Sequence, residues 1–180
     1  ESYVSSAATP VSRMLSRESW RLLARALPGV LSDGADTAAR ADVQLGAAWA
    51  GLAIENAMLG AAHAMANPLT ATHHVIHGQA VGLALPHVVR FNARTCGDAY
   101  TDLLAVIGIA ATPGTAGERL AAWLEELLQA ARLARSLREL GITSPDIPAL
   151  ATLAATQWTG SFNPRSLGAD DWNALYEAVR

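Results

Sequence analysis

The sequence is poor in the residues that several common sites require. Of its 180 residues none is lysine, and only one, Cys96, is cysteine. Without lysine the chain cannot form a Schiff base, use a lysine base or build a P-loop. A lone cysteine can form no internal disulfide and has no thiol partner for a metal site, which fits the reducing cytoplasm where we expect the protein to reside. We interpret Cys96 as a small, half-buried residue.

Charge is also scarce. Charged residues make up 16% of the chain and hydrophobic residues 51%, which argues against disorder and predicts one domain with a large core. The net charge of −3 is not the strongly positive charge that is typical of nucleic-acid-binding domains. The first ten residues do not resemble a signal peptide. Because the chain begins with Glu rather than Met, we expect a fragment, a processed product or a numbering that starts late.

The scarcity of charge is greatest between residues 56 and 89, where the chain has no Asp, Glu, Lys or Arg. This run is longer than the roughly 20 residues that a membrane-spanning helix needs. Pro68 and three histidines would nevertheless lie at mid-depth, and no basic cluster marks the ends. We therefore interpret the run as the buried core of a soluble protein.

Helical periodicity dominates, and no segment alternates with period two, so the predicted fold class is all-α. The glycines at 108, 114 and 117 are not a dinucleotide fingerprint, because no strand precedes them. Thr9-Pro10 predicts a cap followed by proline at the first helical position, and Asp36 can cap a second helix. We expect helices at about 10–26, 37–66, 77–89, 98–108, 115–140, 148–158 and 170–180, and the second is apolar on nearly every side from 42 to 66.

Three details of these helices can be tested. The first should bury an apolar face that includes Val11 and Met14, with arginines at steps of four on a solvated outer face rather than an anion-binding track. The second should be buried on all sides. Asn67-Pro68 should end it, because proline lacks an N–H and disfavours a helical residue before it.

Four of the five histidines lie between residues 63 and 78, and imidazole is a common ligand for iron and zinc. His63 and His77 could converge across the turn predicted at Asn67-Pro68. His73 and His77 form a rival pair if that turn is helical. For any single histidine a role in the core or a loop is the alternative, which we favour for His73, His74 and His87. The segment holds no carboxylate, so a metal site needs ligands from elsewhere.

The stretch from Gly60 to Asn92, GAAHAMANPLTATHHVIHGQAVGLALPHVVRFN, resembles the signature of the iron-containing, or group III metal-dependent, alcohol dehydrogenases. His63 and His77 have the family's spacing, and 85–92 match its L-P-H-V-x-R-x-N ending. The resemblance extends to ESYVS at 1–5 and to FNPR at 162–165. It implies a multi-helix bundle like the C-terminal domain of the dehydroquinate synthase-like fold, over residues 1–180, with the N-terminal nucleotide-binding domain missing.

The resemblance also implies roles for individual residues. His63 and His77 would be two of four ligands to iron(II) or another divalent ion, zinc included, and an Asp and a His upstream of Glu1 would be the others. Ile54 and Thr159 would line the substrate pocket. Asn67 stands where many relatives have a second histidine near the substrate, and an amide cannot relay a proton at neutral pH. No residue is assigned to cofactor binding.

The implied activity is reversible hydride transfer between an alcohol and NAD or NADP, giving an aldehyde or ketone. The 180-residue chain alone should be inactive and should bind metal weakly. The expected partners are the small alcohol or aldehyde and the missing domain. Association with further copies of the chain is left open, and neither nucleic acid nor a membrane is expected as a partner. The alternatives are a non-catalytic helical binding or assembly module and a related enzyme such as a glycerol dehydrogenase, maleylacetate reductase or dehydroquinate synthase.

Overall fold

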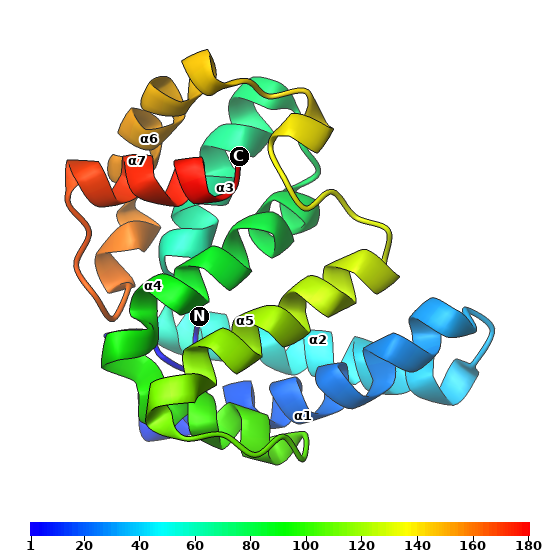
Figure 1. The fold of residues 1–180 in the computed structure, drawn as a ribbon. Helices are drawn as coiled ribbons and strands as arrows, with labels where there is room; N and C mark the ends of the chain where they lie inside the picture. The colour runs from blue at the N-terminus through cyan, green and yellow to red at the C-terminus, as the bar shows by residue number, and fades with distance from the viewer.

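The computed structural model describes the backbone of residues 1–180 and all side chains but that of Pro145. This described part consists of helices and connecting loops, without a strand, which confirms the all-α class. Figure 1 shows the helices crossing in a bundle. The α-helices are α1 (Pro10–Ser32), α2 (Thr37–Ala57), α3 (Ala61–His73), α4 (His77–Val106), α5 (Pro113–Ala130), α6 (Ile147–Ala155) and α7 (Ala169–Ala178). The short 3-10 helices are η1 (Arg138–Leu140), η2 (Ser144–Asp146) and η3 (Trp158–Phe162).

The first two helices form a hairpin. Thr9 caps α1 in a capping box with Ser12, as the Thr-Pro start predicts, and the Asp36 carboxylate accepts the N–H groups that open α2. The two helices pack mainly against each other. In Figure 1 the end of this hairpin, near residues 32–37, extends away from the other helices.

The buried face of α1 differs from the prediction. Val11 and Met14 are 59% and 63% exposed, while three serines lie on the buried side: Ser12, Ser16 and Ser19. The Ser19 hydroxyl donates to the Gly46 carbonyl of α2 at 2.7 Å. Small side chains allow the two helices to approach closely, and each serine hydroxyl has a partner: the Thr9 carbonyl for Ser12, the Ser2 hydroxyl for Ser16 and the Gly46 carbonyl for Ser19. The predicted outer face is confirmed for Arg17, which is exposed and pairs with Asp102 at 3.4 Å.

The prediction of one helix from the Asp36 cap to Ala66, buried on all sides, is wrong, although the cap itself is confirmed. The chain leaves the helix at Met58, whose φ of 64° is rare outside glycine, and α3 begins after Gly60. A Cβ at Gly60 would lie 2.9 Å from a Glu1 carboxylate oxygen, so a larger residue here would displace that carboxylate. Only three residues of α2 are buried: Gly46, Ala53 and Ala57.

Asn67-Pro68 does not end a helix, contrary to the prediction. Pro68 lies inside α3, where buried neighbours such as Met65 and Leu69 hold the backbone helical despite the lost N–H. The helix instead ends at His73, and the capping residue His74 adopts the left-handed conformation with φ 56° and donates its N–H to the Leu69 carbonyl. The buried Val75 follows, as in many helix ends that close on an apolar contact.

The helices predicted at 77–89 and 98–108 are one helix, α4. Between the two predicted segments the helix continues and makes close contacts: Asn92 bonds to Asn163, and Gly97 lies against the backbone of Pro113. The next helix, α5, begins at Pro113 with a capping box between Thr112 and Thr115, and so starts earlier than the predicted 115. It ends at Ala130 rather than near Gly141.

The core has two parts that meet along α4. One contains α3, α6, α7 and the first half of α4, and the other contains the second half of α4 and α5. Tyr176 of α7 is fully buried and donates its hydroxyl to the Met65 carbonyl at 2.7 Å, which ties the chain's last helix to α3. Among the helices described, none is both long and apolar enough to cross a bilayer.

Candidate metal centre

The structure brings His63 and His77 together. His63 is the third residue of α3 and His77 the first of α4. Their ring centroids are 5.4 Å apart, and the ring planes are tilted by 52°. The pair is the predicted one, but the turn that allows it is at residues 74–76 and not at Asn67-Pro68. His63 is partly buried and His77 exposed, so the pair opens on the surface.

The other histidines lie elsewhere. His73 is the last residue of α3 and His74 its left-handed cap, so the rival idea of His73 and His77 on one helical face is wrong. His87 lies nearly three turns beyond His77 on α4. Burial lowers the pKa of His87, and the neighbouring Arg90 lowers it further, which favours a neutral ring.

The remaining predicted site residues have unequal support in the structure. Asn67 lies one turn after His63 on α3, and its Nδ2 donates to Gln157 Oε1 at 2.9 Å. Thr159, two residues later in η3, is 5% exposed, and its hydroxyl has no hydrogen-bond partner among the described residues. Ile54 is half-buried near the end of α2, and its place in a pocket rests on the resemblance alone.

Glu1 is a residue that the sequence interpretation missed. Its side chain, 7% exposed, accepts the Ala62 N–H at 2.6 Å and the His63 N–H at 3.3 Å, and it hydrogen-bonds to His63 Nδ1. Burial raises the pKa of the Glu1 carboxyl, but the hydrogen bonds from His63 and from the Ala62 N–H lower it, and the pKa lies below its usual value. The carboxylate thus occupies the positive end of α3. Only its place in the ESYVS match could have indicated it.

Two sequence motifs meet beside this helix start. Asn92, which ends LPHVVRFN, and Asn163 of FNPR exchange two side-chain hydrogen bonds at 2.8 and 2.9 Å. Asn163 also accepts the Ala61 N–H at 3.3 Å. The Arg165 guanidinium lies 3.7 Å from the Phe91 ring centre. Both motifs therefore hold the first turn of α3, and with it His63, against α4.

The donor set fits part of a metal site. Two imidazoles can each bind a divalent ion at about 2.1 Å, and rings separated as these are can share one. In the described residues no group of three or more His, Cys, Asp and Glu side chains could hold an ion. The two histidines alone are one short of the three protein ligands of a typical catalytic centre.

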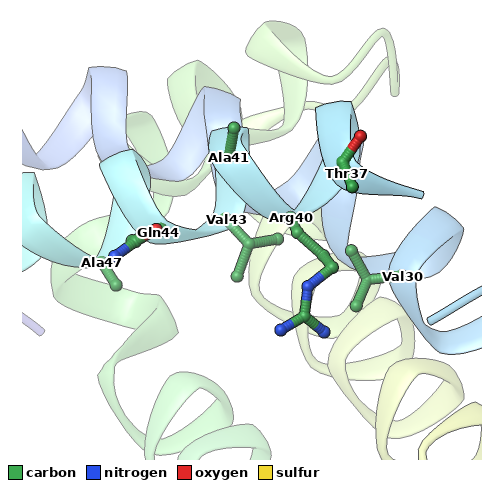
Figure 2. Close-up of a pocket in the computed structure, with 7 residues that line it drawn as sticks. All are labelled: Val30, Thr37, Arg40, Ala41, Val43, Gln44 and Ala47. Carbon is green, nitrogen blue, oxygen red and sulfur yellow. The ribbon is translucent and has the colours of Figure 1, made fainter. Parts of the chain in front are cut away.

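A hollow on α2 is a poor candidate for this chemistry. Figure 2 shows it between the start of α2 and Val30 of α1, with the Arg40 guanidinium beside Val43. Its lining contains no His, Cys, Asp or Glu: Val30, Thr37, Arg40, Ala41, Val43, Gln44 and Ala47. Arginine is too basic to exchange protons at neutral pH, so this surface lacks an acid-base group.

The chain resembles known oxidoreductases over its whole length. It is 33% identical over 182 residues to the lactaldehyde reductase of Escherichia coli (strain K12), with 99% of this chain and 47% of the relative covered. It is 30% identical over 179 residues to the 1,3-propanediol dehydrogenase of Klebsiella pneumoniae, covering 98% of this chain and 46% of that protein. The chain thus spans about half the length of these relatives.

Solved structures of alcohol oxidoreductases contain the same fold. A 1,3-propanediol oxidoreductase superposes with a TM-score of 0.96 and 29% identity, over 100% of this chain and 48% of that one. An alcohol dehydrogenase from Oenococcus oeni, 23% identical, has the same fold with a TM-score of 0.96 over 100% and 48% of the two chains. The model of the Fe-containing alcohol dehydrogenase family, C-terminal, matches residues 1–180. The chain belongs to the Fe-containing alcohol dehydrogenase family and corresponds to its C-terminal part.

Proposed function

We propose that residues 1–180 supply two ligands, His63 and His77, to the divalent metal site of an NAD(P)-linked alcohol dehydrogenase. The observation that carries this proposal is the meeting of two imidazoles, fourteen residues apart, at the starts of two different helices. The ion is iron(II) or another divalent metal such as zinc. The remaining ligands, an Asp and a His in the family pattern, lie outside these residues, as do the groups that bind the nucleotide.

The substrate class follows from the relatives. Two are a lactaldehyde reductase and a 1,3-propanediol dehydrogenase, and we propose that this protein interconverts a small alcohol and its aldehyde or ketone. A divalent cation in such a site supplies Lewis acidity, which lowers the pKa of an alcohol hydroxyl and polarises a carbonyl in the reverse direction. The residues of this chain hold the ion and shape the cavity beside it.

Asn67 limits how protons leave this site. Its amide donates to Gln157 and is therefore fixed between α3 and η3, close to the ligand face of α3. An amide can orient a substrate oxygen by a hydrogen bond, but it cannot accept and pass on a proton near pH 7. We propose that Asn67 orients the substrate, with Ile54 and the buried Thr159 as further pocket residues, and that water carries the proton.

The test uses the full protein that contains these residues. Alcohol oxidation with NAD and with NADP, together with metal analysis, is measured for His63→Ala and His77→Ala, with His73→Ala and His74→Ala as matched controls from the same segment. We expect the first two variants to lose both bound metal and activity, and the controls to keep both. Absence of metal and activity from the unsubstituted protein would favour the helical assembly module instead.

The 180-residue chain alone should be inactive and should bind metal weakly, because it supplies only part of the ligand set. A tightly bound stoichiometric ion in the isolated chain would contradict this division of ligands. Such a result would mean that two histidines recruit further ligands within residues 1–180.

A further inference from the structure

We propose that Glu1 is a positioning residue for His63, which it holds in the one tautomer and ring orientation that leave Nε2 free to bind a metal ion. This inference rests on the proposed function for its purpose, although the arrangement itself can be tested without metal. Glu1 is not expected to bind the ion, since its carboxylate is already engaged.

The carboxylate is held by α3 itself. One oxygen accepts the Ala62 N–H at 2.6 Å, and the other accepts the His63 N–H at 3.3 Å and contacts His63 Nδ1. These N–H groups belong to the first turn of the helix, where no intrahelical acceptor exists and an anion is favoured. The backbone and the ring of His63 are thus bound to the same carboxylate group, which restricts the ring relative to the helix.

The chain around Glu1 fixes it in turn. Its carbonyl accepts the N–H groups of Val4 and Ser5 at 3.0 and 2.9 Å, forming a tight turn. Opposite the carboxylate lies Gly60, where any Cβ would meet Glu1 Oε1 at 2.9 Å. The break between α2 and α3 therefore provides both the free N–H groups and the space that this carboxylate occupies.

The chemistry of the contact determines the tautomer. An ionised carboxylate accepts hydrogen bonds and cannot donate, so His63 Nδ1 must carry the hydrogen. In a neutral imidazole the lone pair is then on Nε2, the nitrogen left for a metal ion. Carboxylate partners of this kind orient metal-binding histidines, and their loss typically reduces metal affinity about 10–100-fold.

The first experiment reads the tautomer directly in metal-free protein. Imidazole nitrogen NMR at neutral pH should show His63 with a protonated Nδ1 and an unprotonated Nε2. Glu1→Gln keeps an acceptor for the Ala62 N–H but can also offer an amide N–H to His63, so the single tautomer should be lost. Glu55→Gln, at an exposed site on α2, is the matched control and should leave the His63 signals unchanged.

The second experiment measures Zn²⁺ affinity by competition with a chromophoric chelator in the same full-length variants. We expect Glu1→Gln to weaken binding about 10–100-fold, Glu1→Asp to recover part of the loss and Glu55→Gln to have no effect. Circular dichroism and the melting temperature report whether each variant folds. If Glu1→Gln does not fold, the tautomer of His63 in the unsubstituted protein decides the matter.

A His63 ring with its hydrogen on Nε2 in the unsubstituted protein would overturn the proposal, and so would full Zn²⁺ affinity in a folded Glu1→Gln variant. The expected tautomer combined with no Zn²⁺ binding by the unsubstituted protein would instead contradict the proposed metal function. The two failures are therefore distinguishable.

Discussion

Helices α2 and α3 follow one another in the sequence and are both rich in alanine and poor in charge, yet their surroundings are opposite. Seven of the thirteen residues of α3 are buried, against three of the twenty-one in α2. The reason is the number of neighbours: α3 packs on α4, α6 and η3, whereas α2 packs mainly on α1. Scarcity of charge therefore marks both helices as apolar without indicating which one the fold covers.

The proposed metal ligand His63 lies on the covered helix, α3. The first turn of α3 is fixed by Glu1 and Asn163 and carries His63, while the outer side of α2 exposes Leu45 and Leu52 at 46% and 50%. A rigid helix start can hold a ligand in place, because its backbone groups are all bound. Substitutions in the two helices should therefore have very different costs.

The largest expected effect is that of Met65→Ala in α3. Met65 is completely buried, and its truncation leaves a cavity, so the free energy of unfolding should fall by about 2–5 kcal/mol. Urea unfolding followed by circular dichroism measures it. The control is Leu52→Ala in α2, which should change the free energy of unfolding by well under half of that amount. Equal losses of stability in the two variants would contradict the contrast between the helices.

Gly97→Ala in α4 should come next. A Cβ at this position would lie 2.5 Å from the Pro113 carbonyl oxygen, a backbone atom that cannot move aside without shifting α5. Overpacking of this kind costs about 1–3 kcal/mol, which the same unfolding measurement would show as a lower midpoint. An unchanged midpoint would mean that α4 and α5 are not in such close contact.

Gly51→Ala in α2 should have the opposite sign. Apart from the helix's own nearby backbone and chain neighbours, no atom lies within 4 Å of a Cβ built there, and alanine is favoured over glycine in a helix interior by about 0.5–1 kcal/mol. Thermal unfolding should therefore show a higher melting temperature for this variant. A lower melting temperature for Gly51→Ala would indicate that other atoms pack against this side of α2.

The smallest effect concerns Arg90 of α4, which pairs with Glu118 and Glu125 of α5 at the surface. Its hydrogen bonds hold the pKa of each carboxyl below the usual value. A carboxyl with a lowered folded-state pKa adds stability above its unfolded pKa of about 4.3 and loses it as pH falls through the folded value.

Arg90→Ala should therefore reduce stability near pH 7 by about 1 kcal/mol or less, because solvent reaches both partly exposed pairs and screens them, and the difference should vanish at strongly acidic pH. Urea midpoints of the two proteins across this pH range provide the measurement. A difference that persists in acid would show that Arg90 acts through packing of its side chain rather than through charge.

The elements that the sequence predicted best depend on local chemistry. The caps at Thr9 and Asp36 were visible because their hydrogen bonds lie within four residues. The breaks predicted at Asn67-Pro68 and after Val89 were wrong, because tertiary packing of α3 and α4 outweighs the local cost of proline and the interruption expected after Val89. Where long-range contacts decide, a local pattern is not sufficient.

For the candidate site, too, the sequence indicated some residues and missed others. The spacing of His63 and His77 indicated the pair, and the structure confirms that their rings meet. Glu1 and Gln157 were missed, because their partners lie 62 and 90 residues away in the sequence. Nothing in the composition near either residue indicates such a contact. The roles of Asn67, Ile54 and Thr159 stay predictions.

The central claim is that His63 and His77 share one divalent ion, and it is tested most directly by titrating the full protein with Zn²⁺ while observing the imidazole NMR signals of all five histidines. The signals of His63 and His77 should change together with a single saturation curve, while that of His87, far along α4, should not. Independent curves for the two, or a response confined to His73 and His74, would contradict the account.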